Sequence, residues 1–139
     1  MNRIIGIDYG DKRVGIAVSD LLGFGAHGVG TIENNGLNSL ITEIMKTIAE
    51  YSPEKIVVGM PLNMDGTKGF RGEATEKFIE RLSSQFDGEI IRWDERLTTM
   101  GANRFLNETN TRGKKRKGVI DTVSACLILD SYLSSVKNC

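Results

Sequence analysis

The stretch that most constrains the fold is residues 55–60, which read Lys-Ile-Val-Val-Gly-Met and carry no charge after the first position. An uninterrupted apolar run of this length is typical of a strand buried on both faces, since a strand with one wet face alternates polar and apolar residues. Pro53, just before the run, ends the helical pattern that precedes it. The run therefore predicts a strand inside a sheet that is covered by helices.

The periodicity of the remaining sequence predicts further elements around this run. Expected strands cover residues 3–8, 13–19, 26–32 and 89–93, and expected helices cover residues 37–51, 72–86, 98–107 and 119–136. Parallel strands need a helix-length crossover, whereas antiparallel neighbours need only a turn such as residues 9–12. We therefore predict an α/β fold with a mixed five-stranded sheet, in which three antiparallel strands come first, helix-connected strands follow and helices flank the sheet.

Length and composition fit one domain over residues 1–139, because a chain of this size with 40% hydrophobic residues can bury a core without disulfides. The 18 basic and 18 acidic residues cancel, so net charge alone indicates no polyelectrolyte partner. Cys126 and Cys139 do not resemble the disulfide framework of a small secreted domain. Without a signal-peptide pattern or a membrane-length apolar run, we expect a cytoplasmic protein that has no membrane partner.

Three acidic residues stand at the boundaries of expected elements. Asp8 ends the first strand, Glu95 follows Asp94 after the strand at 89–93, and Asp121 falls in the first turn of the last expected helix. Since side chains alternate along a strand, only one of Asp94 and Glu95 can point towards Asp8, and we favour Glu95. Taken singly, Asp8 is equally typical of a turn, and Asp121 of a favourable helix-dipole interaction. Together, the carboxylates could share a hard cation, which indicates metal-dependent phosphodiester chemistry.

Glycines lie next to this acidic set. Gly6 shares a strand face with Asp8, and Gly10 and Gly15 belong to the same expected hairpin. Because glycine has no side chain, these positions predict room for a ligand that approaches Asp8.

A basic segment precedes the last expected helix. Residues 101–118 contain six basic residues and one acidic residue. Five of the basic residues stand within six positions, namely Arg112, Lys114, Lys115, Arg116 and Lys117. Such a run is usually a solvated loop, but beside a carboxylate cluster a cationic loop suits a substrate rich in phosphates. Lys12, Arg13 and Arg96 are further candidates for phosphate contacts, with pairing to Asp94 as the alternative for Arg96.

Two loops complete the set of candidates. Residues 59–67 follow the buried strand at the end where open α/β sheets commonly bind ligands, so Asn63 and Asp65 could line the site. Turn formation is the alternative for both, and Asp65 before a glycine favours it. Residues 23–28 match the dinucleotide pattern GxGxxG, but no helix opens after them, so we reject that interpretation. His27 has no second ligand nearby in sequence, which makes a zinc site improbable.

Four separated motifs carry a resemblance to a known family. They are residues 5–10 (IGIDYG) with 12–20 (KRVGIAVSD), residues 59–66, residues 94–99 (DERLTT) and residues 120–121. In this order, and over nearly the whole chain, they resemble the YqgF family of ribonuclease H-like proteins, whose members are described as pre-16S rRNA nucleases and, earlier, as Holliday junction resolvases. The resemblance implies a ribonuclease H-like fold, a catalytic and metal-binding triad of Asp8, Glu95 and Asp121, and Mg²⁺ or Mn²⁺ as cofactor.

The resulting hypothesis is a metal-dependent nuclease that processes the 5′ end of pre-16S rRNA in ribosome biogenesis, with nucleic acid and the small ribosomal subunit precursor as partners. Asp8 would bridge two divalent cations, and Glu95 and Asp121 would each complete one coordination sphere. Two alternatives stay open, a Holliday junction resolvase acting on branched DNA and an rRNA-binding assembly factor without catalysis. An actin-like ATPase, suggested by the motif at residues 8–10, is disfavoured because it needs two lobes.

Overall fold

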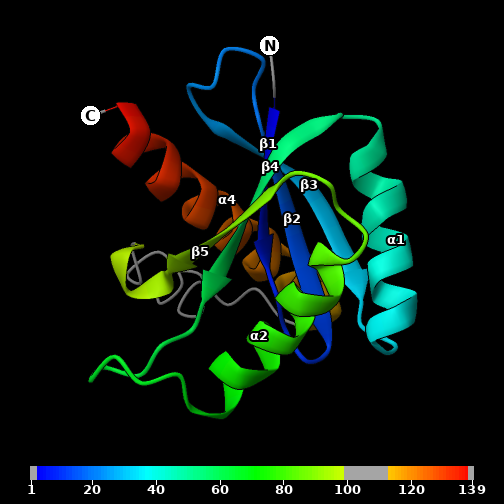
Figure 1. Cartoon of the computed structure of the whole chain (residues 1–139), viewed down its shortest axis with the longest axis vertical. Coiled ribbons are helices and arrows are strands. Elements are labelled where there is room, and N and C mark those ends of the chain that lie inside the picture. The colour runs from blue at the N-terminus through cyan, green and yellow to red at the C-terminus, as the bar shows by residue number, and fades with distance from the viewer. Residues whose placement is uncertain (1–2, 99–112, 138–139) are drawn as a thin grey trace.

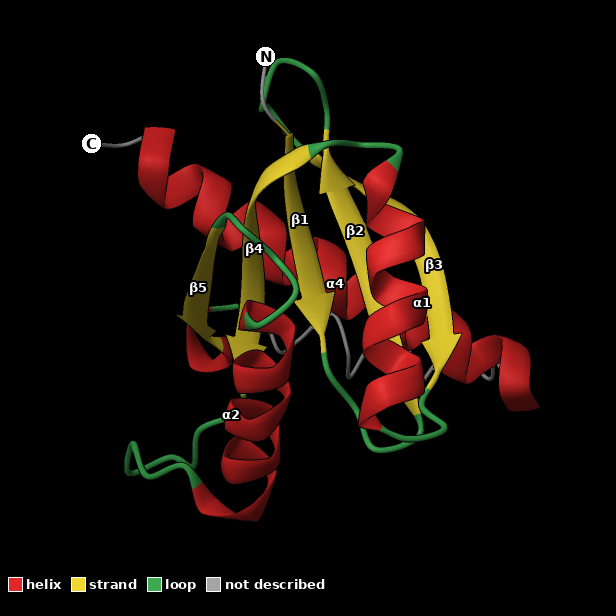
Figure 2. Ribbon diagram, turned by 45° about the vertical axis from the view of Figure 1, so that its right-hand side comes forward, coloured by secondary structure: helices red, strands yellow, loops and turns green. Residues whose placement is uncertain are grey.

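A five-stranded mixed sheet forms the centre of the computed structural model, which describes residues 3–98 and 113–137 (Figure 2). Its strands are β1 (Arg3–Asp8), β2 (Arg13–Ser19), β3 (Ala26–Glu33), β4 (Pro53–Met60) and β5 (Glu89–Asp94). The spatial order is β3-β2-β1-β4-β5, with β1, β2 and β3 antiparallel and β1, β4 and β5 parallel. The predicted mixed sheet, with three antiparallel strands followed by helix-connected strands, is confirmed.

Helices cover both faces of the sheet (Figures 1 and 2). Helices α1 (Leu37–Ala49) and α2 (Gly69–Ser83) lie on one face, and α4 (Gly113–Lys137) crosses the other. The short 3-10 helix η1 (Glu95–Leu97) follows β5. Ile5 and Ile7 of β1 face the first core with Phe78 of α2, whereas Val57 of β4 faces the second core with Leu129 of α4. No helix in the described residues is long and apolar enough to cross a membrane.

Helix α4 starts earlier than the sequence pattern indicated. It begins at Gly113 rather than at 119, so the positions of Lys114, Lys115, Arg116 and Lys117 are helical and the predicted loop is wrong there. Asp121 consequently lies in the third turn of the helix, and our placement of Asp121 in the first turn is wrong as well. The helix expected at 98–107 lies, after its first residue, outside the described residues, and Thr98 ends η1.

The other boundaries agree closely with expectation. Helix α2 begins three residues before its predicted start, and strands β3 and β5 are each one residue longer than predicted. The glycine-rich residues 23–28 form the turn after β2 and the start of β3, so no helix follows that pattern. The rejection of a dinucleotide site there is consistent with this arrangement.

Glycines set how closely α4 approaches the sheet. A Cβ at Gly15 would overlap the backbone carbonyl oxygen of Asp121, and one at Gly6 would lie 2.8 Å from Cβ of Leu129. At Gly10 a Cβ would meet the carbonyl oxygen of Arg13 at 2.5 Å. The protein itself therefore fills the space at all three positions, and our prediction that this space admits a ligand is wrong. Gly6 and Gly15 instead allow α4 to pack closely on β1 and β2, whereas Gly10 allows the chain to pass close to Arg13.

Candidate active site

The candidate site lies at the edge of the sheet where the parallel strands β1, β4 and β5 have their carboxyl ends (Figure 2). Asp8 is the last residue of β1, and Glu95 is the first residue after β5. Parallel pairing of β1 with β4 and of β4 with β5 brings both ends to the same edge. The residues are 87 positions apart in sequence but are separated in the sheet only by β4.

Asp8 and Glu95 form a carboxyl–carboxyl pair. Burial raises the pKa of Asp8 well above its ordinary value, and the charge of Glu95 and a hydrogen bond with Glu95 raise it further. Burial also raises the pKa of Glu95, while the hydrogen bond from Asp8 opposes that rise. When no cation is present, the two groups are expected to share a proton, because two like charges in contact and partly withdrawn from water are unfavourable.

Gly59 of β4 makes this pairing possible. A Cβ at this position would lie 2.9 Å from Cγ of Glu95 and would overlap Cδ1 of Ile128. Since Gly59 sits on the strand between the two carboxyl groups, the missing side chain opens a path for Glu95 across β4 towards Asp8. This role of Gly59 was not predicted from the sequence.

Asp94 points to a different partner from its neighbour Glu95. Its Oδ1 accepts from the backbone N–H of Arg96 at 2.9 Å, and the Arg96 guanidinium donates to both carboxylate oxygens from Nε at 3.1 Å and Nη2 at 2.8 Å. These hydrogen bonds hold the pKa of Asp94 below its usual value. Our choice of Glu95 over Asp94 as the residue facing Asp8 agrees with this geometry. Of the two alternatives for Arg96, pairing with Asp94 is observed.

Asp121 reaches the site from α4. Asp121, Ala125 and Leu129 recur every four residues and therefore share the helix face that packs on the sheet, where Ala125 and Leu129 are fully buried. The backbone of Asp121 lies on Gly15, which pairs with Asp8 across β1 and β2. The charge of Asp121 raises the pKa of Asp8, after the larger effects of burial and of Glu95. The three predicted acidic residues therefore lie in one electrostatic neighbourhood.

Arg13 holds the Asp121 carboxylate. Its Nε donates to Oδ2 of Asp121 at 3.1 Å, and both side chains are about three-quarters buried, with exposures of 25% and 24%. Arg13 leaves β2 on the same face as Gly15, two residues away, which explains why it meets α4. We expected Arg13 to contact nucleic acid, but its observed partner is a carboxylate of the candidate site.

The donor set suits a hard divalent cation, because carboxylate oxygens are the preferred ligands of Mg²⁺ and Mn²⁺. Two half-buried carboxyl groups that share a proton would also gain from a cation in the proton's place. In the part of the chain that the structure describes, no three His, Cys, Asp or Glu side chains already converge on a common metal position. The residues fit a metal, then, but Asp121 is held by Arg13 and the site is not preassembled.

A further cation, missed by the sequence analysis, acts on the carboxyl pair. The positive charge of Arg71 in the first turn of α2 opposes the pKa rise of both Asp8 and Glu95. The sequence does contain a signal for it. A helix that follows a parallel strand starts at the strand's carboxyl end, so the first turn of α2 had to lie near this edge.

The remaining predicted contact residues divide into three groups. Lys12 is exposed in the β1–β2 turn. The side chains of Lys114, Lys115, Arg116 and Lys117 belong to the part of α4 whose side chains are not described, and Arg112 lies outside the described residues. Nδ2 of Asn63 donates a hydrogen bond to the Thr67 hydroxyl at 2.9 Å, and that hydroxyl donates to Oδ1 of Asp65 at 2.7 Å. Their observed contacts are those of a turn, and a role in lining the site stays a prediction.

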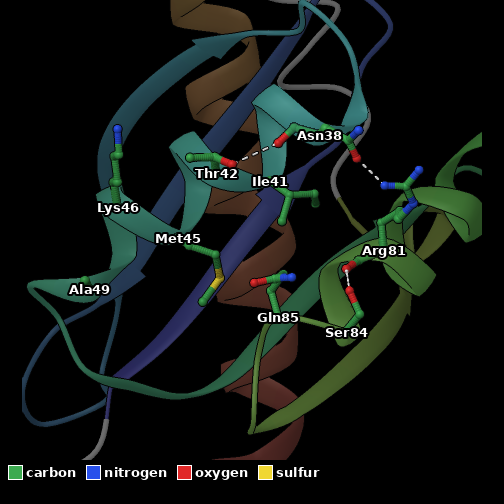
Figure 3. Close-up of a pocket in the computed structure, with 9 residues that line it drawn as sticks. All are labelled: Asn38, Ile41, Thr42, Met45, Lys46, Ala49, Arg81, Ser84 and Gln85. Carbon is green, nitrogen blue, oxygen red and sulfur yellow. Dashed lines mark hydrogen bonds between the residues drawn. The ribbon is translucent and has the colours of Figure 1, made fainter.

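A groove of about 550 Å³ lies between α1 and α2, away from the carboxyl groups (Figure 3). Its walls include Ile41 and Met45 from α1 and Gln85 after α2, and Arg81 closes one end by donating a hydrogen bond to Asn38. None of its lining residues is acidic. The groove is large but offers no carboxylate, so the carboxyl pair remains the candidate site.

Solved structures with a similar fold are resolvases. The structure of T. thermophilus RuvC in complex with a Holliday junction substrate matches with a TM-score of 0.61 at 11% identity, over 98% of this chain and 97% of that chain. The fowlpox virus Holliday junction resolvase matches with a TM-score of 0.55 at 12% identity, over 96% of this chain and 99% of that chain. These likenesses confirm the ribonuclease H-like fold.

Sequence comparisons extend over nearly the full length. A protein of Ruminiclostridium cellulolyticum is 47% identical over 135 residues, covering 96% of this chain and 95% of that protein. A protein of Clostridium tetani is 44% identical over 136 residues, covering 98% and 99%. Both carry the name "Putative pre-16S rRNA nuclease". The family model described as "RuvX: Holliday junction resolvase" matches residues 2–135, and the chain therefore belongs to the RuvX (YqgF) family.

Proposed function

We propose that this protein is a divalent-cation-dependent nuclease that hydrolyses phosphodiester bonds of pre-16S rRNA. The observation that carries the proposal is the half-buried pair of Asp8 and Glu95, within range of the Asp121 charge, at the carboxyl edge of the parallel strands. Perturbed carboxyl groups at such an edge are typical of catalytic sites. The choice of RNA follows the names of relatives that are 44–47% identical over nearly the full chain.

Asp8, Glu95 and Asp121 would hold the cation. When bound, Mg²⁺ or Mn²⁺ would supply positive charge that neutralises the carboxylates and polarises a phosphodiester. The chain's own groups prepare this site. Asp8 and Glu95 are both partly withdrawn from solvent, and the absence of a side chain at Gly59 leaves the space in which Glu95 lies. Electrostatic stabilisation in a site that is partly withdrawn from water is stronger than at a fully exposed surface.

Arg13 would act as a positioning residue for Asp121. The ion pair fixes the direction of the Asp121 carboxylate and neutralises its charge before a cation arrives. Binding of a cation by all three carboxylates would require Asp121 to share or leave this contact, because its Oδ2 already accepts from Arg13. The protein is therefore expected to complete its metal site only when the cation binds.

The proposal is tested by cleavage of a 5′-extended precursor of 16S rRNA in the presence of Mn²⁺. Wild type should cleave the precursor, chelator should abolish cleavage, and Asp8→Asn should lower the rate by roughly a thousandfold or more. Asp20→Asn is a matched control, since Asp20 lies in the turn after β2 and its carboxylate bonds to Phe24 of the same turn. Undiminished cleavage by Asp8→Asn would remove the residue from the mechanism.

A Holliday junction resolvase is the second candidate, favoured by the description of the matching family model. Phosphate contacts carry little base information, so the same site could act on either backbone. Cleavage of a four-way DNA junction under the same conditions separates the two functions. Faster cleavage of the junction than of the rRNA precursor would favour resolution. Binding of RNA in chelator, with no cleavage in Mn²⁺, would instead indicate an assembly factor without catalysis.

A further inference from the structure

Three arginines stand near the carboxyl groups, and they differ in what they bind. Arg13 is paired with Asp121, and Arg96 is paired with Asp94 through a two-pronged contact. Among the described residues, the guanidinium of Arg71 makes no hydrogen bond or ion pair. Arg71 is also exposed to solvent. An arginine that faces solvent beside the carboxyl pair, with no partner in the part of the chain that the structure describes, is available for an anion.

The register of α2 directs Arg71 towards the site. Arg71, Thr75 and Phe78 stand at positions i, i+4 and i+7, so they share one face of the helix. Thr75 and Phe78 are buried, with exposures of 1% and 0%, which identifies this face as the one turned to the sheet. Phe78 stacks on Tyr9, the residue after Asp8, with ring centroids 4.6 Å apart. Arg71 lies on the same face about two turns before Phe78, near the N-terminus of the helix.

The start of α2 is fixed against the end of β4. Gly72 is buried, and a Cβ added there would lie 3.6 Å from the carbonyl oxygen of Pro61, the first residue after β4. Figure 2 shows this end of α2 reaching past the carboxyl edge of the sheet, on the side where β1 and β4 end. Arg71 thus stands at the rim of the candidate site, and its charge acts on both Asp8 and Glu95 without a direct ion pair.

We propose that Arg71 binds a backbone phosphate of the substrate strand as that strand approaches the Asp8–Glu95 pair. Guanidinium groups bind phosphate oxygens through two parallel hydrogen bonds, which gives position as well as charge. A cation at the rim would also lessen the repulsion between the substrate strand and the carboxylates. This inference rests on the proposed nuclease function and adds a substrate-binding residue to it.

Full-length protein carrying Asp8→Asn, in chelator, is suited to the test because it binds without cleaving. Fluorescence anisotropy with a labelled 16S rRNA precursor fragment and, separately, a four-way DNA junction gives the dissociation constant across a series of KCl concentrations. Adding Arg71→Ala should weaken binding about tenfold and reduce the salt slope by about one. Arg71→Lys should recover part of the affinity, because charge is kept and the two-pronged contact is lost.

Lys77→Ala is the matched control, an exposed cation further along the same helix and away from the site. Thermal melting should show Arg71→Ala and Lys77→Ala as stable as their parent. Equal affinities and salt slopes for the two variants on both probes would overturn the role of Arg71, as would the absence of measurable binding. If the wild-type protein cleaves neither probe but Arg71→Ala alone weakens binding, hydrolysis fails while the phosphate contact stands.

Discussion

Asp94 and Glu95 are adjacent in the chain, yet they lie in opposite chemical environments. Asp94 is held at the surface by Arg96, and those hydrogen bonds lower its pKa. Glu95 turns inwards over Gly59 to meet Asp8, and burial raises the pKa of both members of that pair. The outward pair is satisfied and contributes to structure. The inward pair would bring two like charges together if both groups were ionised, and in that sense it is strained, as expected of groups that await a cation.

Neutralising Glu95 or Asp94 should give the largest difference between the inward and the outward carboxylate. Glu95→Gln should lower the rate of Mn²⁺-dependent RNA cleavage by roughly a hundredfold or more, because a carboxylate of the cluster is lost. Asp94→Asn should change the rate only a few fold. Initial rates on the same rRNA precursor give both values. A comparable loss in Asp94→Asn would contradict the assignment of the two neighbours to different roles.

Filling the void at Gly59 should disturb the inward pair through its packing. In Gly59→Ala the new methyl group would press on Cγ of Glu95 and on Ile128, at a cost of about 1–3 kcal/mol in the free energy of unfolding. Cleavage should fall with it, since Glu95 is displaced from Asp8. Urea unfolding and initial rates measure the two effects.

Gly25→Ala serves as the control for Gly59→Ala, because the nearest atom to a Cβ there is 4.0 Å away. It should leave both stability and rate close to those of wild type. Gly59→Ala with unchanged stability would mean that the path of Glu95 across β4 is less tightly packed than the structure shows.

The inward pair also predicts an unusual pH dependence of stability. The pKa of Asp8 is raised in the folded state, so the unfolded chain releases this proton first, near pH 4, and folding stability falls as pH rises from there through the folded pKa. Asp8→Asn removes this loss. Its melting temperature should therefore exceed that of wild type by a few degrees at neutral pH, with little difference below pH 4.

Addition of Mn²⁺ provides the complement to that experiment. The cation should raise the melting temperature of wild type at neutral pH and have a much smaller effect on Asp8→Asn, because a ligand stabilises the state that binds it. If Asp8→Asn were destabilised at neutral pH, the pair would be a net stabilising contact, and the description of it as strained would be wrong.

The outward pair predicts the smallest effect, with the opposite sign. Arg96→Gln should lower the melting temperature only slightly at neutral pH, because the ion pair is partly exposed. The pKa of Asp94 is lowered in the folded state, so its contribution is present above the unfolded value and fades as pH falls through the folded one. Melting of wild type and variant should therefore converge in acid. A difference that grew in acid would contradict the pairing.

Much of the fold was predictable because strands and helices leave local patterns of polar and apolar residues in the sequence. The run at 55–60 indicated a buried strand, and β4 lies second from the edge with its middle residues fully buried. The start of α4 was missed because Gly113, Gly118 and clustered like charges all disfavour a helix in isolation. The contacts of α4 with β1, β2 and β3 supply tertiary stabilisation that no local pattern contains.

The positions of the site residues were predictable where they depend on side-chain alternation along a strand. They were not predictable where they depend on how a helix packs across the sheet. Alternation along β5 indicated that only one of Asp94 and Glu95 could face Asp8, and the favoured residue, Glu95, is the one that does. The Arg13–Asp121 pair depends on how α4 crosses β2, which the sequence does not state, so Arg13 was assigned to nucleic acid instead. Gly6 and Gly15 were noticed, but the protein's own helix occupies the space they leave.

The most direct test of the central claim is anomalous diffraction from crystals of the wild-type protein grown with Mn²⁺. The structure predicts an anomalous peak between the carboxylates of Asp8 and Glu95, with Asp121 turned towards it and the contact with Arg13 lengthened or broken. A fully occupied Mn²⁺ elsewhere, with Asp8 still bonded to Glu95 and Asp121 still bonded to Arg13, would contradict the claim that these carboxylates form the metal site.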